Sequence, residues 1–312
     1  MEEEIIKSGM EEMKSVAEIF GDDGGAFRFG GKWIVLTNDM LVESSDVLKE
    51  MSPEDAGFKC VTMNVSDLVA MGSEPMYFGF SIGLPEENLR NVKKYFRGIA
   101  EALRLYGMRL ISADTNSARE LVIDGIALGM ADRLLLRKNA RSGQVVCVTG
   151  DLGKCFSALL VSLRGFDADE GVRKALFEKI LRPRARADLV GELVRISECA
   201  IDISDGLVKE LKEISEASRC GIVIYPEKIP VSGEVLEFCS VNSLNPIDIA
   251  MNSGEEYEII FTADMNDLES AEFDFTIIGE VVEGSGVWIR DRSGLREAED
   301  RSWKHFSQNS AV

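Results

Sequence analysis

Histidine is nearly absent from this 312-residue sequence, which contains only His305, close to the C-terminus. Ser-His-Asp and Cys-His catalysis, and metal sites built on histidine, are therefore almost excluded. Cys-x-x-Cys pairs are missing too, so we expect neither a disulfide framework nor a zinc site, and small buried hydrophobic side chains are the simpler interpretation of the cysteines. The cysteines are Cys60, Cys147, Cys155, Cys199, Cys220 and Cys239.

Long apolar runs and excess positive charge are also missing. No apolar run reaches about 18 residues, so we expect no transmembrane helix. The acidic start (MEEE) is not followed by a basic segment with an apolar core, which predicts no signal peptide and a cytoplasmic protein. With 35 Lys and Arg against 54 Asp and Glu, the formal net charge is −19. Direct binding to nucleic acid or an anionic membrane is thus disfavoured, although phosphates can still bind through divalent cations.

Aromatic residues make up 7% of the chain, so the core must consist mainly of aliphatic side chains and methionine. A hydrophobic fraction of 45% fits a folded enzyme, and the length suits two domains. The basic, aperiodic segment 132–143 separates two stretches of helix and strand patterns. We therefore predict domains over residues 1–136 and 137–312, and an α/β (α+β) fold of two tandem α/β units.

Hydrophobic periodicity predicts the elements of each unit. In the first, helices are expected over 5–19, 52–71 and 86–106, and strands over 33–37, 76–82, 108–113 and 121–131. In the second, strands are expected over 145–148, 199–203, 221–225, 256–262, 275–282 and 286–290, and helices over 155–164, 170–181, 187–197 and 206–218.

The segment 200–207 (AIDISDGL) combines two carboxylates and a hydroxyl within four positions, Asp202, Ser204 and Asp205. It follows an apolar pair and precedes a predicted helix, so the polar side chains should lie at the end of a strand. A simpler interpretation is that Asp205 caps the helix while Asp202 forms a turn.

Aspartates recur in similar settings elsewhere. Asp23 lies in a glycine-rich turn, Asp39 and Asp114 at predicted strand ends, and Asp67 within a predicted helix. Each could occupy an ordinary turn or solvated position. However, strand ends deliver side chains to shared clefts, and several hard oxygen ligands in one cleft suit Mg2+ and a polyphosphate.

Three further groups of residues are weaker candidates. Residues 149–153 (TGDLG) could cradle a phosphate at a helix start, but they lack the Lys-Ser/Thr ending of a P-loop. Arg137, Arg182 and Arg184 could bind phosphates or simply lie on the surface. Residues 254–261 (GEEYEIIF) place acids at the head of a predicted strand, which also fits an acidic edge strand.

Taken in order, these motifs resemble the thiamine-monophosphate kinase family of the AIR synthetase-like ATP-binding superfamily. The similarity spans nearly the whole chain, and segments 64–72 (NVSDLVAMG), 202–207 (DISDGL), 254–258 (GEEYE) and 303–306 (WKHF) carry it. Four positions, in three segments, depart from the family pattern. Asp46 stands where the family often has His, Ser112-Ala113 where it has two glycines, and Glu256 where it has Asp.

The resemblance implies two AIR synthetase-like domains, a homodimer formed through the N-terminal domains, and phosphorylation of thiamine monophosphate by ATP. It also implies three sets of site residues. The Mg2+ ligands would be Asp23, Thr37, Asn38, Asp39, Asp67, Asp114, Asp202 and Asp205. The ATP contacts would be Ala113, Asp114, Arg137 and Ser204. The substrate contacts would be Asp46, Glu255 and Trp303.

The expected chemistry requires no general base, because the accepting phosphate oxygen is already anionic near neutral pH. Positioning and charge neutralisation by metal ions would then dominate a direct in-line transfer. Two alternatives stay open at this point. One is another ligase or kinase of the same superfamily; a selenophosphate synthetase would need a reactive cysteine near the N-terminus, whereas the first here is Cys60. The other is a non-catalytic protein that binds divalent metal.

Overall fold

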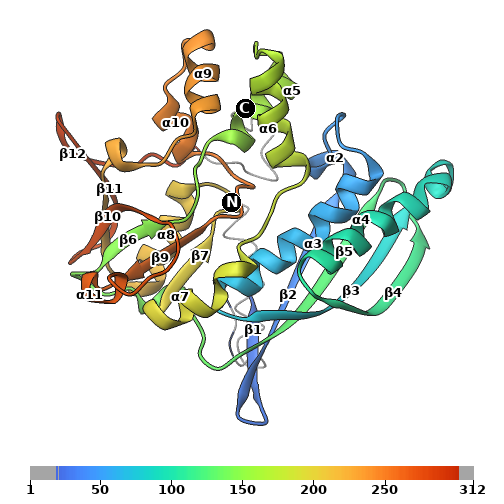
Figure 1. The fold of residues 1–312 in the computed structure, drawn as a ribbon, viewed down its shortest axis with the longest axis horizontal. Helices are drawn as coiled ribbons and strands as arrows, with labels where there is room; N and C mark the ends of the chain where they lie inside the picture. The colour runs from blue at the N-terminus through green and yellow to red at the C-terminus, as the bar shows by residue number, and fades with distance from the viewer. Residues whose placement is uncertain (1–18, 20, 302–312) are drawn as a thin grey trace.

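The computed structural model describes residue 19 and residues 21–301. Two α/β halves lie side by side, each built on its own sheet (Figure 1). The first sheet has the strand order β1-β2-β5-β3-β4, and the second has the order β12-β11-β8-β10-β6-β9-β7. The predicted pair of tandem α/β units is therefore confirmed. Within the described part of the chain, no helix is long and apolar enough to cross a membrane.

The first half contains a mixed sheet and two long helices. Its strands are β1 (Gly25–Phe29), β2 (Lys32–Val42), β3 (Glu74–Leu84), β4 (Arg109–Ser117) and β5 (Val122–Ala131). Its helices are α2 (Glu43–Asp46), α3 (Pro53–Ala70), the 3-10 turn η1 (Glu86–Asn91) and α4 (Val92–Leu105).

The second half combines a seven-stranded sheet with helices that are partly grouped along the chain. Its strands are β6 (Val145–Val148), β7 (Cys199–Asp202), β8 (Gly221–Ile224), β9 (Ile259–Ala263), β10 (Thr276–Val282), β11 (Gly286–Asp291) and β12 (Gly294–Glu297). Its helices are α5 (Lys154–Arg164), α6 (Glu170–Leu181), α7 (Val190–Ile196), α8 (Leu207–Ser218), α9 (Gly233–Asn242), α10 (Pro246–Met251) and α11 (Met265–Leu268). The 3-10 turns are η2 (Arg137–Asn139), η3 (Ala187–Leu189) and η4 (Pro226–Lys228).

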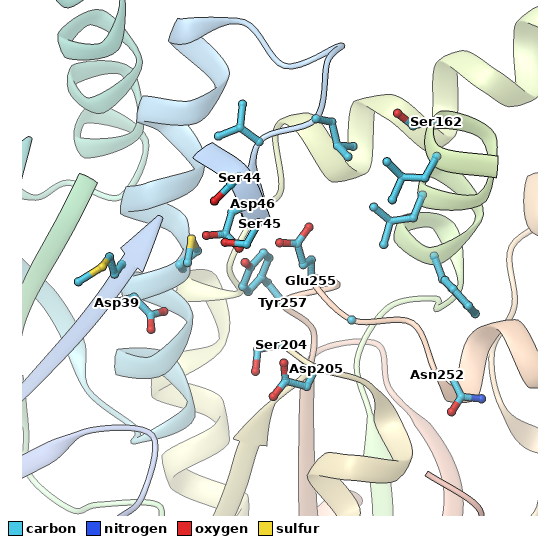
Figure 2. Close-up of a pocket in the computed structure, with 18 of the residues that line it drawn as sticks. Asp39, Ser44, Ser45, Asp46, Ser162, Ser204, Asp205, Asn252, Glu255 and Tyr257 are labelled. Carbon is cyan, nitrogen blue, oxygen red and sulfur yellow. The ribbon is translucent and has the colours of Figure 1, made fainter. Parts of the chain in front are cut away.

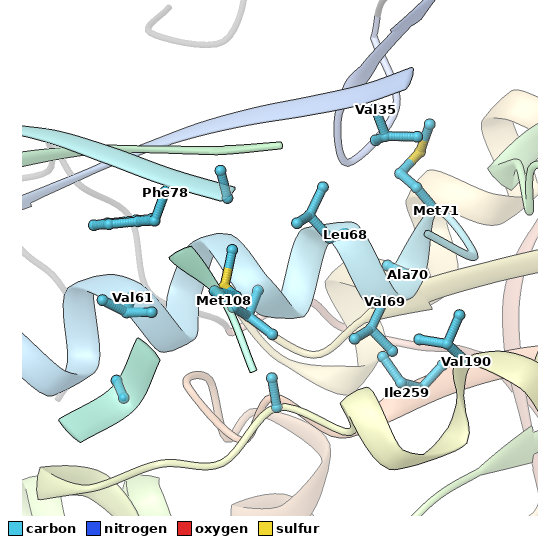
Figure 3. Close-up of a cluster of buried hydrophobic side chains, with 14 of the residues drawn as sticks. Val35, Val61, Leu68, Val69, Ala70, Met71, Phe78, Met108, Val190 and Ile259 are labelled. Atoms are coloured by element: carbon cyan, nitrogen blue, oxygen red, sulfur yellow. The ribbon is translucent and has the colours of Figure 1, made fainter. Parts of the chain in front are cut away.

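Helix α3 is the element that joins the halves. Its start is fixed by a reciprocal capping box, in which Ser52 Oγ accepts from Asp55 N–H and the Asp55 carboxylate accepts from Ser52 N–H. Most of its residues are buried, because α3 packs on the first sheet on one side and on elements of the second half on the other (Figure 3). The buried cluster around it includes Val35, Val61, Leu68, Val69, Ala70, Met71, Phe78 and Met108 from the first half, and Val190 and Ile259 from the second.

Several expectations about the strands are corrected. Asp39 and Asp114 are not at strand ends: β2 continues to Val42 and β4 to Ser117. Both strands are prolonged by backbone pairing with long neighbours, β2 along β5 and β4 along β3. The strand predicted to begin at residue 256 begins at Ile259. Strands β1 and β12 and helices α9 and α10 were not predicted, and the helix expected over 5–19 lies almost entirely outside the described residues.

The cysteines behave as expected of small hydrophobic side chains. All six are buried and free. Burial raises the pKa of the Cys147 and Cys199 thiols to about 12, so neither is a thiolate near neutral pH.

Candidate active site

Three aspartates from distant parts of the chain meet at the boundary between the halves. Asp23 comes from the turn before β1, Asp67 from α3 and Asp202 from the end of β7. One carboxylate oxygen of each lies within 4.8 Å of the others. Ser66 Oγ, adjacent on α3, donates to Asp202 Oδ2 at 2.5 Å and ties the strand end to the helix. The convergence expected from the aspartate motifs is thus present for these three residues.

The crowding of three aspartates, one buried and two partly buried, changes the acidity of their carboxyl groups. The pKa of Asp202 is raised to about 8, chiefly by loss of hydration and then by the negative charge of Asp23. The pKa of Asp67 is raised well above its ordinary value by burial and by the charges of Asp39, Asp202 and Asp23. Three ionised carboxylates are therefore unfavourable here unless additional positive charge is supplied.

The cluster has the donor set of a hard divalent cation. Its ligand atoms are carboxylate oxygens, which Mg2+ and Ca2+ prefer over nitrogen or sulfur. Asp23 Oδ2 is buried and accepts no hydrogen bond from the described residues. An orphaned buried carboxylate oxygen is costly unless something positive approaches it. The residues present therefore fit a bound Mg2+.

Arg137 supplies the nearest positive charge. Its Nη2 donates to Asp23 Oδ1 at 2.5 Å, its Nε lies 3.6 Å from Asp22 Oδ1, and its backbone N–H also faces the Asp22 carboxylate. Its guanidinium neutralises part of the charge on Asp23 and opposes the effect of burial on the pKa of that carboxyl. In this structure Arg137 thus binds the acids next to the cluster, and its contact with ATP stays a prediction.

A cavity of about 440 Å³ opens beside the cluster, between the two halves (Figure 2). Asp67 belongs both to the cluster and to the lining of this cavity. The other predicted site residues that line it are Asp39, Asp46, Ser204, Asp205 and Glu255. One wall is apolar and comes from α5, with Phe156, Leu159 and Leu163. A ligand with an anionic group and a ring could place its ring against the apolar wall and its anionic group near the acids. Cations would then have to lie between the anionic group and the acidic side chains.

Asp205 faces this cavity instead of capping α8. The N-cap position is Gly206, which makes no side-chain cap, and the Asp205 carboxylate pairs with Lys209. The alternative interpretation of Asp205 as a helix cap is therefore wrong. The backbone N–H of Asp205 donates to Glu210 Oε1 at 2.9 Å, and Ser204 Oγ lies 3.3 Å from the same oxygen. Buried Glu210 was missed by sequence reasoning; its only signal is an acid on the apolar face of a predicted helix.

Thr37 and Asn38 serve the framework around the site. The Thr37 side chain is buried, and its hydroxyl donates to the backbone oxygen of Asn64 at 3.1 Å, which ties β2 to α3. Asn38 points to the opposite face of β2, where its amide donates to Asp124 Oδ1 and to the Gly125 oxygen at 2.9 Å each. Neither side chain lines the cavity.

The remaining predicted contacts lie elsewhere. Across the sheet, Asp39 pairs with Gly125, Gly125 with Phe80, and Phe80 with Ala113. Three strand spacings separate Asp39 from Ala113, or roughly 14 Å. Ala113 and Asp114 are thus not brought to the cavity within one chain, and Trp303 lies outside the described residues.

The glycine-rich segment 149–153 holds a protein carboxylate. The backbone N–H groups of Gly153 and Cys155, at the start of α5, donate to Glu256 Oε1 at 2.8 and 3.2 Å. Ser253 Oγ donates to the same oxygen at 2.6 Å. The helix N-terminus that could have cradled a phosphate is therefore occupied by Glu256, which fixes α5 against the segment that carries Glu255.

Arg182 likewise faces protein acids, since its Nε lies 2.5 Å from Asp55 Oδ1 and its Nη1 lies 2.7 Å from Glu101 Oε2. This arginine ties the end of α6 to helices α3 and α4. It does not line the cavity beside the aspartate cluster.

The segment 254–258 has an unusual backbone. Glu255 and Tyr257 adopt φ values of +58° and +51°, a left-handed conformation that costs a residue other than glycine about 1–3 kcal/mol. It is held by Glu255 N–H donating to the Ser204 oxygen at 2.7 Å and Tyr257 N–H donating to the Ile203 oxygen at 2.9 Å. Gly254 approaches so closely that a Cβ would lie 2.7 Å from the Ser204 oxygen. Such strain is concentrated at functional sites.

Comparison with known proteins accounts for most of the chain. Residues 21–131 match the AIR synthase related protein N-terminal domain, and residues 141–291 match the corresponding C-terminal domain. The thiamine-monophosphate kinase of Pyrococcus horikoshii is 46% identical over 315 residues, covering 100% of this chain and 98% of that protein.

Solved structures agree. A structure described as AaThiL complexed with AMPPCP and TMP superposes with a TM-score of 0.89 at 32% identity, covering 97% of this chain and 95% of that one. The thiamine monophosphate kinase of Aquifex aeolicus gives a TM-score of 0.83 at 31% identity, with 92% and 94% covered.

Proposed function

Because the chain belongs to the thiamine-monophosphate kinase family, we propose that it transfers the terminal phosphoryl group of ATP to thiamine monophosphate, yielding thiamine diphosphate and ADP. The observation that carries the proposal is the partly buried aspartate cluster beside a cavity with an apolar wall. The membership predicted from the sequence motifs is confirmed by identity over the full chain.

The carboxylates beside the cavity would bind the metal ions that the reaction needs. Asp23, Asp67 and Asp202 would hold Mg2+, with Asp39 and Asp205 facing the same space. When bound, Mg2+ would neutralise the negative charge that accumulates when two phosphate groups approach in line. The acceptor oxygen carries its own negative charge, so the protein needs to position the two phosphates and exclude water but not to remove a proton.

The other end of the cavity suits the rest of the acceptor. Asp46 and Glu255 lie together there (Figure 2), and opposite charge favours the cationic thiazolium ring of thiamine monophosphate. The side chains of Phe156 and Leu159 on α5 offer apolar surface for the heterocycles. Asp46 stands where the family often has His. It would thus offer the substrate a polar side chain that attracts positive charge, whereas a protonated histidine would repel it.

We further propose that two copies associate through the outer face of the first sheet. Strand alternation and register place six exposed, large hydrophobic side chains on this face, turned away from α3. They are Phe27, Phe29, Leu36, Met40, Tyr77 and Ile126. Apolar surface of this extent is expected to be covered by another molecule. Asp114 lies on the same face, so we propose that Ala113 and Asp114 serve the site of the other copy.

The test is incubation of the protein with Mg2+, ATP and thiamine monophosphate, followed by chromatography. We expect equimolar thiamine diphosphate and ADP, and neither product when EDTA replaces Mg2+. Folded protein that forms no thiamine diphosphate would overturn the kinase assignment. A non-catalytic metal-binding protein would bind Mg2+ equally well with and without nucleotide, and would leave ATP intact. The cytoplasmic location stays a prediction.

A further inference from the structure

A lysine is buried under the cavity wall. Lys59 belongs to α3 and is 1% exposed, yet it carries a charged end. Its Nζ lies 2.5 Å from Glu255 Oε1 and donates to the backbone oxygen of Asp46 at 3.2 Å. A buried ammonium group is tolerated only where it is paired. Lys59 is thus held by two residues that line the cavity, one from each half of the molecule.

Among the described residues, the Glu255 side chain pairs with Lys59, and the other contacts of Glu255 involve its backbone. Its N–H group donates to the Ser204 oxygen, and its own oxygen lies 3.3 Å from Cys155 Sγ. The left-handed φ at Glu255 and at Tyr257 shows that this backbone is held away from its relaxed conformation. The Glu255 side chain is 26% exposed and meets Lys59 at its inner end.

The charges around Glu255 explain what Lys59 contributes. Asp46 and Glu255 lie close together on the same part of the cavity wall (Figure 2). One oxygen of the Asp46 carboxylate, Oδ2, accepts a hydrogen bond from Val42 N–H at 2.7 Å. Without a cation below them, the two acids would repel each other, and Glu255 could lower the repulsion by rotating away.

We propose that Lys59 is a positioning residue for the substrate end of the cavity: it holds the Glu255 carboxylate beside Asp46 and fixes the second half against α3 at that point. This inference rests on the proposed function, in which Glu255 contacts thiamine monophosphate. Lys59 contacts Glu255 and Asp46 and pairs directly with neither the aspartate cluster nor the predicted ATP contacts, so its influence should fall mainly on the acceptor.

The first experiment compares steady-state kinetics of the wild-type protein and Lys59→Met, a substitution of similar length without charge. We expect the KM for thiamine monophosphate to rise about tenfold or more, the scale of a lost charge-assisted contact. The KM for ATP and the kcat should change less than threefold. If the wild-type protein forms thiamine diphosphate and Lys59→Met has the same kinetic constants, the inference is overturned while the kinase assignment stays intact.

A double-mutant cycle separates positioning from general stability. If Lys59 acts through Glu255, Lys59→Met should raise the KM little further in a Glu255→Gln background. Val61→Ala is the matched control, because Val61 is fully buried on the same helix and does not line the cavity. It should lower the Tm without raising the KM. Equal KM increases from Lys59→Met in both backgrounds would refute the proposed role.

Hydrogen exchange tests the contact without any turnover. The amides of Glu255 and Tyr257 donate to residues 203 and 204, and Lys59→Met should speed their exchange by at least tenfold relative to the wild type. Val61→Ala should not produce a comparable local change. This readout decides the role of Lys59 even if thiamine monophosphate proves not to be the acceptor, whereas unchanged protection at both amides would contradict it.

Discussion

At the scale of single residues, the site is dominated by negative charge held out of water. The raised pKa of Asp202, about 8, means that the protein retains a proton there near neutral pH in the absence of a cation. Asp22, next to the cluster, has its pKa raised to about 6 by burial and by the charge of Asp23. Sites of this kind are destabilising until a positive ligand compensates them.

The first prediction concerns pH and metal removal. The folded pKa of Asp202 exceeds the ordinary Asp value of about 4, so between pH 4 and 8 the folded state binds more protons than the unfolded state. The contribution of Asp202 to the free energy of unfolding must therefore decrease as pH rises through this window. We expect the Tm in EDTA to fall from pH 5.5 to pH 8, and Mg2+ to raise it more at pH 8. Scanning calorimetry measures both.

Asp202→Asn is the matched variant, because it removes the titrating group while keeping the shape of the side chain. In EDTA it should show a smaller fall in Tm over the same pH range, and it should lose most of the stabilisation by Mg2+. An Mg2+-induced shift that is equal at both pH values, or undiminished in the variant, would contradict the assignment of the cluster.

The second prediction concerns Asp205. Its carboxylate lines the cavity and pairs with Lys209, but it caps no helix. If Asp205 holds Mg2+ as the family resemblance implies, Asp205→Asn should reduce turnover at least about 100-fold, since a lost metal contact is worth several kcal/mol of charge stabilisation. The free energy of unfolding should change by less than about 1 kcal/mol, as expected of a partly exposed ion pair. The initial rate of ADP formation and urea unfolding test the two statements, with the exposed Asp264→Asn as control.

At the scale of elements, the contact between α3 and α4 depends on two glycines. A Cβ on Gly98 would lie 1.8 Å from the backbone oxygen of Glu54, and a Cβ on Gly57 would lie 2.2 Å from the backbone oxygen of Tyr95. The helices can thus approach backbone to backbone only because both positions lack a side chain. Since α3 carries Asp67, this crossing also sets the position of the cluster.

The third prediction follows from that crossing. Gly98→Ala should lower the free energy of unfolding by about 1–3 kcal/mol or more, because the helices must separate. Gly191→Ala in α7 is the matched control, since nothing lies within 4 Å of its Cβ position. It should be neutral or stabilising by roughly 0.5–1 kcal/mol, the usual gain from replacing a helical glycine. Similar unfolding midpoints for the two variants in urea would contradict this account.

At the scale of the whole molecule, one hydrophobic cluster around α3 (Figure 3) and one cavity are built from residues of both halves. The outer face of the first sheet remains open to solvent in a single chain. Its apolar side chains are the basis of the proposed homodimer.

The fourth prediction tests this association. Light scattering should give twice the chain mass for the wild-type protein and one chain mass for Ile126→Arg, which places a charge in the middle of the face. Leu295→Arg, at an exposed position on β12 of the other half, should leave the dimer intact. Turnover should fall with the loss of the dimer if Asp114 serves the other copy. A fully active wild-type monomer would refute the association.

The sequence by itself determined the elements whose signals are local. The capping residues on either side of Pro53 and the apolar periodicity that follows specify α3, and the valine-rich run at 145–148 is a strand with the predicted bounds. The acidic motifs and their order also indicated the family correctly. Such features depend on neighbouring residues, so they can be recognised before the chain folds.

Only the tertiary structure decided which of these acids meet. Asp39 and Asp114 looked alike in the sequence, yet the pairing of β2, β5, β3 and β4 places them roughly 14 Å or more apart. Glu256 belonged to a recognised motif but its partner could not be foreseen, Lys59 carried no local signal, and each acquired its role from a partner about 100 or more residues away. Long-range packing selects such contacts because buried charges must find partners wherever the fold brings them.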